Sequence, residues 1–312
     1  MDHGGPLVVV VGPTAVGKTA LAVRLCSEVG GEVISADSRQ VYRLMDIGTA
    51  KASAEERRQV RHHLIDVVSP NELLTLAQYQ SLAYAAINEV LARGCVPFLV
   101  GGSGLYVRAV LEGLGIPRVP PNPALRADLL ARAEREGAQS LHAWLSRVDP
   151  QAARAIDPRN TRRVIRALEV YLLTGEPISV QQRACPPPYR TLRLGLTMAR
   201  LLLYRRIDER IERMVQQGLV EEVRSLLEMG YSAELPAMSG VGYRQMVDYI
   251  RGQTDLAEAV RQIKRDTRRF VRQQYNWFRL DDPNIHWFDV GTGLEEVYPA
   301  IREVAVRFLS NP

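Results

Sequence analysis

The residues with the clearest chemical meaning lie near the start of the chain, where Gly12 to Thr19 reads GPTAVGKT. This is the spacing G-x-x-x-x-G-K-T of a phosphate-binding loop (P-loop). In such a loop, successive backbone N–H groups at the N-terminus of a helix surround an anionic oxygen. Lys18 would supply positive charge for the terminal phosphate, and the Thr19 hydroxyl an oxygen ligand for Mg²⁺. The loop predicts a phosphate-bearing ligand, but hydrolysis, phosphoryl transfer and departure of a diphosphate all remain open.

Two other polar residues follow predicted strands. Asp37 comes after the short strand 33–35, and Ser103 lies in a glycine-rich turn after the continuous apolar strand 96–100. Open α/β sheets place their chemistry beyond the carboxyl ends of the strands, so we expect both side chains to face the same crevice as the P-loop. We also expect the backbone N–H groups of the turn to point there. Each has a structural alternative, because Asp37 could cap a helix and the turn could serve the backbone alone.

The long helical pattern at 254–279 is strongly basic. Between Arg261 and Arg279 it holds seven basic residues against one acid, Asp266. Arginines recur on one face and other residues form the packed face. The basic stripe is Arg261, Arg265, Arg268 and Arg272; the packed face is Ile263, Thr267, Phe270, Val271 and Trp277. Basic runs are usually solvated surface, but a stripe of one sign is costly unless an anion neutralises it, which favours a polyanionic partner.

Strand and helix patterns alternate along the chain and must position these groups. Strands are predicted at 7–11, 33–35, 62–68, 96–100, 192–198 and 286–290. Helices are predicted after the P-loop and at 75–92, 124–136, 140–147, 160–174, 201–217, 220–229, 254–279 and 294–309. A capping box at Ser53–Glu56 begins a further short helix. The alternation predicts an α/β fold, with a P-loop NTPase-like parallel sheet flanked by helices.

Proline-rich segments at 115–123 and 186–188 bracket a stretch of helices without strands. We therefore expect a small all-helical domain, 118–189, inserted into a core domain formed by 1–117 and 190–312. Within the insert, Arg162 and Arg166 share one face of the helix 160–174.

The composition is that of a globular protein whose positive charge is almost entirely arginine. The 312 residues carry a net charge of +5, and only three of the 40 basic residues are lysines. Genome composition can also cause an arginine bias, so composition alone does not decide for a polyanionic partner. The three cysteines indicate neither a disulfide framework nor a metal site. No apolar stretch approaches about 18 residues and no leader is recognisable, so we expect a cytoplasmic protein without a membrane anchor.

Eight motifs, in order along nearly the whole chain, resemble those of the tRNA dimethylallyltransferase (tRNA isopentenyltransferase) family. They are GPTAVGKT at 12–19, ISADSRQVYR at 34–43, DIGTAK at 46–51, HHLID at 62–66, LVGGSGLYV at 99–107, RRVIRALEVY at 162–171, GVGYRQ at 240–245 and IKRDTRRFVRQQYNWF at 263–278. The zinc finger of some eukaryotic members is absent, so the resemblance is to the bacterial type.

The resemblance implies transfer of a dimethylallyl group from dimethylallyl diphosphate to the exocyclic amine (N6) of the adenosine 3′ of the anticodon in tRNA, with Mg²⁺ and release of diphosphate. It implies Asp37 as the general base for the adenine amine, Ser103 beside the bridging oxygen, and Lys18 as a stabiliser of the leaving diphosphate. Many members have Thr where this chain has Ser103, and the hydroxyl is kept.

The same resemblance implies the binding residues. The diphosphate would be held by Gly12, Pro13, Thr14, Ala15, Val16, Gly17, Lys18 and Thr19, with Mg²⁺ on Thr19 and with Arg206 or Arg210 as a clamp. The anticodon stem-loop of tRNA, its target base flipped out, would be contacted by Asp37, Ser38, Arg39, Gln40, Ser103, Arg162, Arg163, Arg166, Gly240, Gly242, Tyr243, Arg244, Gln245, Arg268 and Arg272. Gln273 stands where the motif usually has a basic residue, so that one phosphate contact is not expected. A monomer is expected.

Three other classes of protein are alternatives. A P-loop small-molecule kinase would need an acid at the end of a core strand to hold Mg²⁺–ATP, whereas strand 96–100 ends in two glycines. An adenylate isopentenyltransferase, which prenylates a free nucleotide, would require neither the inserted domain nor the basic stripe. An RNA-binding protein with a degenerate P-loop would not require Lys18, Thr19 and Asp37.

Overall fold

The computed structural model describes residues 4–117 and 119–311. The chain divides into two compact units, one formed by the residues up to Val110 and from Pro188 onwards, the other by Leu111–Pro187. The second unit thus begins several residues before the proline-rich segment that suggested its start. The reason is local, because the N–H of Cys185 donates to the C=O of Gly113 at 2.8 Å, which joins the entering and leaving segments inside the second unit.

A parallel sheet forms the centre of the first unit, as the sequence predicts. Its six strands lie in the order β3-β2-β4-β1-β5-β6. They are β1 (Gly4–Val11), β2 (Gly31–Ser35), β3 (His62–His63), β4 (Val96–Val100), β5 (Tyr189–Thr197) and β6 (His286–Asp289). Every pairing is parallel, with Val8 opposite both Phe98 and Leu192. The side chains of the central strand β1 are fully buried from Leu7 to Val10, as expected of a strand covered on both faces.

Strand β3 is shorter than the predicted strand 62–68, which was wrong beyond His63. Leu64 and Asp66 have positive φ angles of 61° and 58°, so the chain leaves the extended conformation there. The following N–H groups bond a loop instead of β2, since Asp66 donates to the C=O of Gln40 and Val67 to that of Val41. This segment therefore holds the loop that follows β2.

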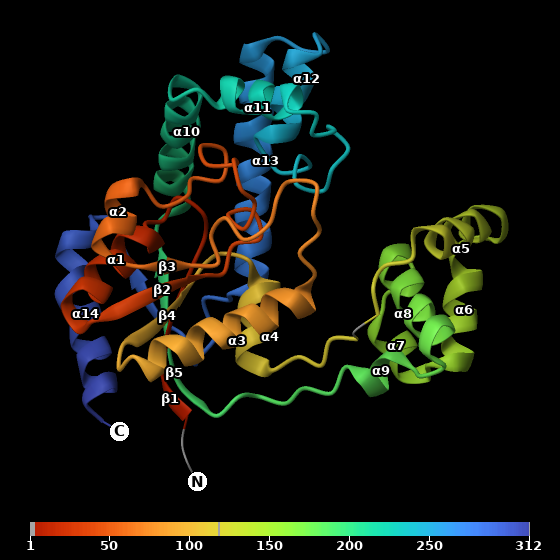
Figure 1. The fold of residues 1–312 in the computed structure, drawn as a ribbon, viewed down its shortest axis with the longest axis horizontal. Helices are drawn as coiled ribbons and strands as arrows, with labels where there is room; N and C mark the ends of the chain where they lie inside the picture. The colour runs from red at the N-terminus through yellow and green to blue at the C-terminus, as the bar shows by residue number, and fades with distance from the viewer. Residues whose placement is uncertain (1–3, 118, 312) are drawn as a thin grey trace. The chain divides into compact units, whose positions relative to one another are not determined.

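Helices cover both faces of the sheet (Figure 1). The crossovers from β1 to β2 and from β3 to β4 run in opposite directions along the sheet, and right-handed connections then place α1 (Lys18–Val29) and α3 (Leu76–Ala92) on opposite faces. Helix α14 (Leu294–Ser310) packs beside α1, and α4 (Gly104–Glu112) lies beside α3 through hydrogen bonds from Tyr84. The predicted capping box is present at the start of α2 (Ala54–Gln59).

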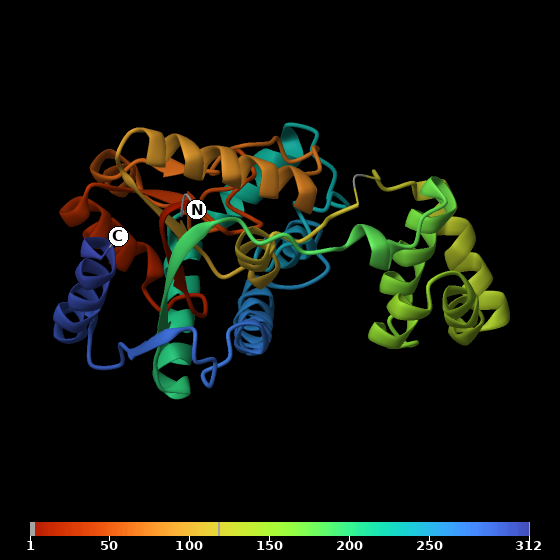
Figure 2. The ribbon, with the colours of Figure 1, turned by 90° about the horizontal axis from the view of Figure 1, so that it is seen from below.

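Four further helices lie between β5 and β6. They are α10 (Arg200–Gln216), α11 (Leu219–Glu228), α12 (Tyr243–Ile250) and α13 (Leu256–Trp277). Helix α12 was not predicted. Helices α10 and α13 run side by side in both views (Figures 1 and 2). Of the predicted packed face of α13, Ile263 and Val271 are buried, but Phe270 and Trp277 are each 41% exposed. Trp277 is therefore only partly packed, with its side chain against Gly104.

The second unit is a helical bundle (Figure 2). Its helices are α5 (Pro123–Glu136), α6 (Ala138–Val148), α7 (Pro150–Ala155), α8 (Thr161–Thr174) and α9 (Ile178–Gln181); the short α7 and α9 were not predicted. Leu141, Leu145 and Leu168 are among the residues of its core. Within the described residues of both units, no helix is long and apolar enough to cross a lipid bilayer.

A buried carboxylate organises one end of this bundle. Glu169 is fully buried and accepts hydrogen bonds from Arg126, from Arg166 and from the backbone N–H of Asn122. Burial alone would raise its pKa, but these donors outweigh burial and hold the pKa of Glu169 at about 2. Arg166 also donates to the C=O of Val119. Of the three arginines of α8 predicted to contact tRNA, Arg166 is therefore engaged inside the unit, whereas Arg162 and Arg163 are exposed.

Candidate active site

The P-loop connects the carboxyl end of β1 to the first residue of α1. Gly12 has φ 140°, and a Cβ there would collide with the C=O of Leu196 in β5, so only glycine fits. Gly17 and Ala15 also have positive φ angles, 109° and 66°, which turn the backbone around a central point. The loop and the start of α1 line a cavity of about 590 Å³, which we call the P-loop cavity. The loop that the spacing predicts as an anion cradle thus lines a cavity large enough for a ligand.

Lys18 occupies the rim of this cradle. Its Nζ donates to the C=O of Gly12 at 3.0 Å and to that of Pro13 at 2.8 Å. Burial lowers the pKa of Lys18 to about 8; the charge of Asp37 partly offsets this effect, and that of Arg210 adds to it. The ammonium group is thus poorly solvated and lacks a salt-bridging anion among the described residues. A bound phosphate would supply one.

Asp37 follows β2 and faces the same cavity. Its Oδ1 accepts the backbone N–H of Arg39 at 2.8 Å and that of Gln40 at 3.4 Å, which closes a turn rather than capping a helix. Among the described residues, none donates a hydrogen bond to Oδ2. One oxygen of the carboxylate is therefore fixed by the backbone, and the other is available to a ligand. The side chain lines the P-loop cavity and also a second cavity, described next.

The second cavity, of about 260 Å³, adjoins the P-loop cavity, and we call it the acceptor cavity. Its polar lining includes Asp37, Ser38 and Ser103, and its apolar lining includes Ile207 and Phe270. Thr14, Ala15, Asp37, Thr49 and Arg210 line both cavities. A molecule that spans both cavities would therefore cross between the P-loop and Asp37.

Ser103 is held at the acceptor cavity by Ser38. The Oγ of Ser103 accepts the N–H of Ser38 at 3.0 Å and donates to its Oγ at 3.3 Å. Two backbone N–H groups of the turn are engaged within the sheet region and are not the free donors that we expected, because the N–H of Gly101 donates to the C=O of Val10 and that of Ser103 to the C=O of Ala36. For these two amides the structural alternative was correct, and Ser103 lines the acceptor cavity.

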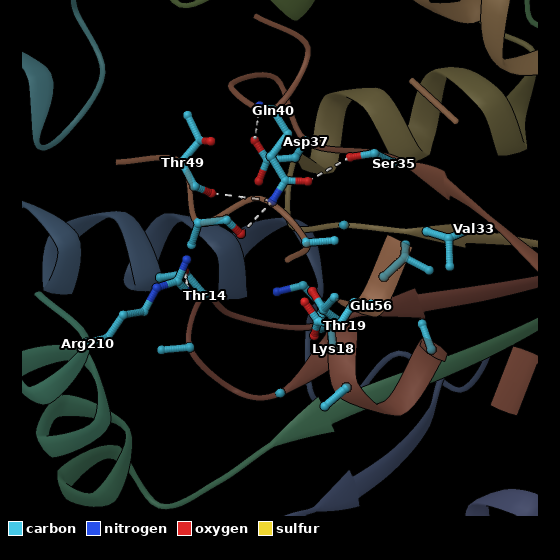
Figure 3. A pocket seen from close by; sticks show the side chains of 18 of the residues that line it. Thr14, Lys18, Thr19, Val33, Ser35, Asp37, Gln40, Thr49, Glu56 and Arg210 are labelled. Atoms are coloured by element: carbon cyan, nitrogen blue, oxygen red, sulfur yellow. Dashed lines mark hydrogen bonds between the residues drawn. The ribbon is translucent and has the colours of Figure 1, made fainter. Parts of the chain in front are cut away.

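Helix α10 contributes one arginine to both cavities. Arg210 Nη1 donates to the Thr14 Oγ1 at 3.4 Å, and its side chain reaches the P-loop from α10 (Figure 3). Burial lowers the pKa of Arg210, and Asp37 partly offsets this. Arg206, the alternative clamp, lines the P-loop cavity only. The geometry therefore favours Arg210 at the junction of the two cavities.

Several residues predicted to contact tRNA form hydrogen bonds that hold the walls of the acceptor cavity. Arg39 donates to the C=O of Pro236 at 2.7 Å, which ties down the loop that carries Gly240 and Gly242. Gln40 donates to the C=O groups of Thr49 and Ala50.

The start of α12 is similarly fixed. The side chain of Gln245 is buried and bonds the N–H of Gly242 and the carboxylate of Asp266. Tyr243 is buried with its hydroxyl on Glu222 at 2.6 Å, although its ring lines the acceptor cavity. Arg244 is exposed and pairs with Asp266 at 2.9 Å. Both Arg244 and the side-chain amide of Gln245 thus bond Asp266 within the protein.

The basic stripe of α13 is largely neutralised within the protein. Within the stripe, Arg261 pairs with Glu258, Arg265 with Asp266, and Arg268 with Asp208. The neighbouring Lys264 pairs with Glu212. The argument that such a stripe needs an external anion was therefore wrong for these positions. Arg272 is exposed and forms no ion pair with the described residues. Arg272 is the member of the stripe that is free to bind a phosphate.

Sequence reasoning missed Gln274 and Glu222. Gln274 is buried and accepts the N–H of Thr14 in the P-loop at 2.9 Å. Its position three residues after the buried Val271 places it on the packed side of α13, and a polar residue at such a position was the available signal. Glu222 accepts the N–H groups of Asp46, Ile47 and Gly48, and no sequence pattern links α11 to that loop.

Comparison with known proteins gives concordant results. Residues 40–281 match the family model described as IPP transferase. A protein of Roseiflexus sp. (strain RS-1) named tRNA dimethylallyltransferase is 54% identical over 274 residues, which cover 88% of this chain and 90% of that protein. The crystal structure of the full-length tRNA isopentenylpyrophosphate transferase from Bacillus halodurans is 43% identical, with a TM-score of 0.73, over 98% of this chain and 97% of that one. A eukaryotic dimethylallyltransferase acting on tRNA is 25% identical, with a TM-score of 0.84, over 99% of this chain and 80% of that one.

Proposed function

The chain belongs to the IPP transferase family of tRNA dimethylallyltransferases, and from this premise we propose the specific reaction that it catalyses. It is a transferase that prenylates tRNA. The donor is dimethylallyl diphosphate, and the acceptor is N6 of the adenosine 3′ of the anticodon. The products are the N6-dimethylallyl adenosine in tRNA and free diphosphate.

The observation that carries this proposal is the shared wall of the two cavities. Thr14, Asp37 and Arg210 line both the P-loop cavity and the acceptor cavity. A diphosphate in the first and an adenine in the second would meet at this wall, where the C–O bond breaks and the C–N bond forms. The apolar side chains of the acceptor cavity, such as Ile207 and Phe270, suit a five-carbon chain and a base better than a second phosphate.

The residues at the wall supply what the reaction requires. As the C–O bond breaks, its electron pair stays on the diphosphate, where Lys18, Arg210 and the P-loop amides stabilise the added charge. The amine nitrogen attacks the carbon and becomes positively charged. Oδ2 of Asp37 then accepts the proton from N6, while Oδ1 stays bonded to the backbone and fixes the carboxylate. The Ser103 hydroxyl, which donates to Ser38 in the free protein, can turn to the bridging oxygen.

The donor atoms present fit a Mg²⁺ that arrives with the diphosphate. Among the described residues, no group of three His, Cys, Asp or Glu could hold a metal by itself. Mg²⁺ commonly takes few protein ligands, keeps several waters and binds phosphate oxygens. The Thr19 hydroxyl lines the P-loop cavity and is the ligand we assign to it. Bound there, Mg²⁺ would neutralise charge on the diphosphate.

The three cysteines form no disulfide, and the substrate is tRNA, so we place the reaction in the cytoplasm. We propose that the protein acts as a monomer, since Lys18, Asp37, Ser103 and Arg210 meet at two adjoining cavities within one chain.

The test is a transfer assay with two acceptors. The protein is incubated with Mg²⁺, labelled dimethylallyl diphosphate and either an unmodified anticodon stem-loop or AMP, with ATP as a control for kinase activity. We expect label in the stem-loop only, and nuclease digestion should place it on the adenosine 3′ of the anticodon. Label in AMP alone, or consumption of ATP without prenyl transfer, would refute the proposal.

A further inference from the structure

One buried side chain joins the two loops of the proposed site. Gln274 on α13 is 4% exposed. Its Oε1 accepts the N–H of Thr14 in the P-loop at 2.9 Å, and its Nε2 donates to the C=O of Gly102 at 3.1 Å. Gly102 precedes Ser103, so this single amide connects the diphosphate loop to the turn that carries the hydroxyl.

The turn is shaped to receive α13 at this point. A Cβ at Gly102 would collide with Nε2 of Gln274, and a Cβ at Gly104 would collide with the side chain of Trp277. Gln274 and Trp277 are three residues apart, so they project from the same side of the helix. Two glycines thus admit two neighbouring side chains of α13, which fixes the helix against the turn in one register.

The geometry matters because the two loops act on one bond. The P-loop holds the departing diphosphate, and Ser103 lies beside the oxygen that the carbon leaves. A misplacement of about 1 Å between reacting groups can cost about 100-fold in rate. The backbone N–H of Thr14 already donates to Gln274. This N–H therefore supports the loop and does not bind the phosphate.

We propose that Gln274 is a positioning residue of the transfer reaction, which holds the P-loop and the Ser103 turn at a fixed separation. This inference rests on the proposed function, because it assigns the diphosphate to the P-loop and the bridging oxygen to Ser103. The competing explanation is that Gln274 only satisfies two buried backbone groups and so contributes to stability alone.

Two substitutions separate these explanations. Gln274→Met keeps the length of the side chain and removes both hydrogen bonds. We expect kcat per folded enzyme to fall about 10- to 100-fold, while the Kd for Mg²⁺–pyrophosphate changes less than about threefold, because Lys18 and the remaining loop amides still bind it. Gln274→Glu keeps the acceptor for Thr14 but adds a negative charge beside the diphosphate, so the Kd for pyrophosphate should rise roughly tenfold or more.

The neighbouring Gln273 provides the matched control, since it lies on the same helix and is exposed. Gln273→Met and Gln273→Glu should leave both kcat and the Kd for pyrophosphate near their original values. Folded fractions and melting temperatures are measured for all four variants, so that a loss of stability is not read as a loss of rate. A wild-type kcat for folded Gln274→Met would overturn the proposal.

A variant of the partner residue covers the case in which Gln274→Met does not fold. Gly102→Ala displaces the amide of Gln274 from the other side and should lower kcat in the same way; an unchanged kcat would then overturn the proposal. If the unmodified protein transfers no prenyl group to tRNA, the proposed function fails. The Kd of Gln274→Glu for pyrophosphate still decides whether Gln274 lies beside a bound diphosphate.

Discussion

Lys18 should make diphosphate binding dependent on pH in the mildly alkaline range. Burial lowers its pKa from an ordinary 10.5 to about 8. The protonated ammonium is the form that attracts diphosphate, so binding of the anion raises the pKa of Lys18 again. Affinity must therefore be full below pH 8 and must weaken as the pH rises through 8, because binding then requires uptake of a proton.

The size of this effect follows from the lowered pKa. The difference between 10.5 and about 8 corresponds to about 3 kcal/mol. If the bound anion restores the ordinary pKa, the Kd for Mg²⁺–pyrophosphate should rise about 30-fold between pH 7 and pH 9.5.

The lowered pKa of Lys18 also affects the stability of the unliganded protein, which it makes rise with pH while the affinity for pyrophosphate falls. Between pH 8 and 10.5 the unfolded chain binds a proton at Lys18 that the folded protein does not, so Lys18 makes the free energy of unfolding rise with pH there.

Titration calorimetry with pyrophosphate can measure this dependence directly. Affinity is measured from pH 7 to 9.5 for the unmodified protein and for Lys18→Met, a neutral side chain of similar length. Pyrophosphate titrates as well, and the difference between the two proteins removes that contribution. At pH 8.5 the unmodified protein should take up about 0.7 more proton on binding than Lys18→Met, as measured in two buffers of different ionisation enthalpy.

The reasoning has a clear point of failure. If the Kd of Lys18→Met and that of the unmodified protein rise with pH in parallel, Lys18 does not titrate in this range. Its contacts with Gly12 and Pro13 would then compensate its burial fully, and the description of a poorly solvated ammonium would be refuted.

Three further predictions concern the other charged groups. Asp37→Asn can still accept the N–H of Arg39, so tRNA binding in a gel-shift assay should be retained while prenyl transfer falls by about 10²- to 10⁴-fold; unchanged turnover would exclude Asp37 as the base. Arg210→Ala should lower kcat/KM for dimethylallyl diphosphate about 10- to 100-fold, the cost of a charge-assisted contact, and Arg206→Ala should lower it less; equal losses would contradict the junction position of Arg210. Arg272→Ala should reduce the slope of log Kd for tRNA against log salt by about 1. Arg268→Ala should chiefly lower the melting temperature, and a change in salt slope equal to that of Arg272→Ala would contradict this division.

The sequence predicted the parts of the fold that depend on local pattern. About twenty consecutive residues contain the signals for the strand Leu7–Val11, for the P-loop and for the helix after it. The structure forms all three as predicted. The capping box at Ser53 is equally local. Asp37 and Ser103 could be placed at one cavity because parallel strands end at the same edge of a sheet.

The parts that depend on pairing across the chain were not predictable in this way. The acids that neutralise Lys264 and Arg268 lie on α10, more than 50 residues earlier, so the stripe appeared unpaired in the sequence. The end of β3 depends on the positive φ of Leu64, which is rare for a leucine and has no sequence signal. Gln274 reads as one polar residue among many until the P-loop and the Gly102 turn are brought against it.

The position of β1 in the sheet has a consequence for synthesis of the chain. Strand β1 needs β5 on one side, and Val11 lies opposite Gly195, about 180 residues later. At ~5–20 residues per second, a ribosome makes β1 roughly 10–40 s before β5 is available. During this interval the nascent chain can form β2, β4 and the helical bundle, but one edge of its most apolar strand stays open. We therefore expect premature termination between β4 and β5 to yield an aggregating fragment, and binding by chaperones to be concentrated on the nascent chain at this stage.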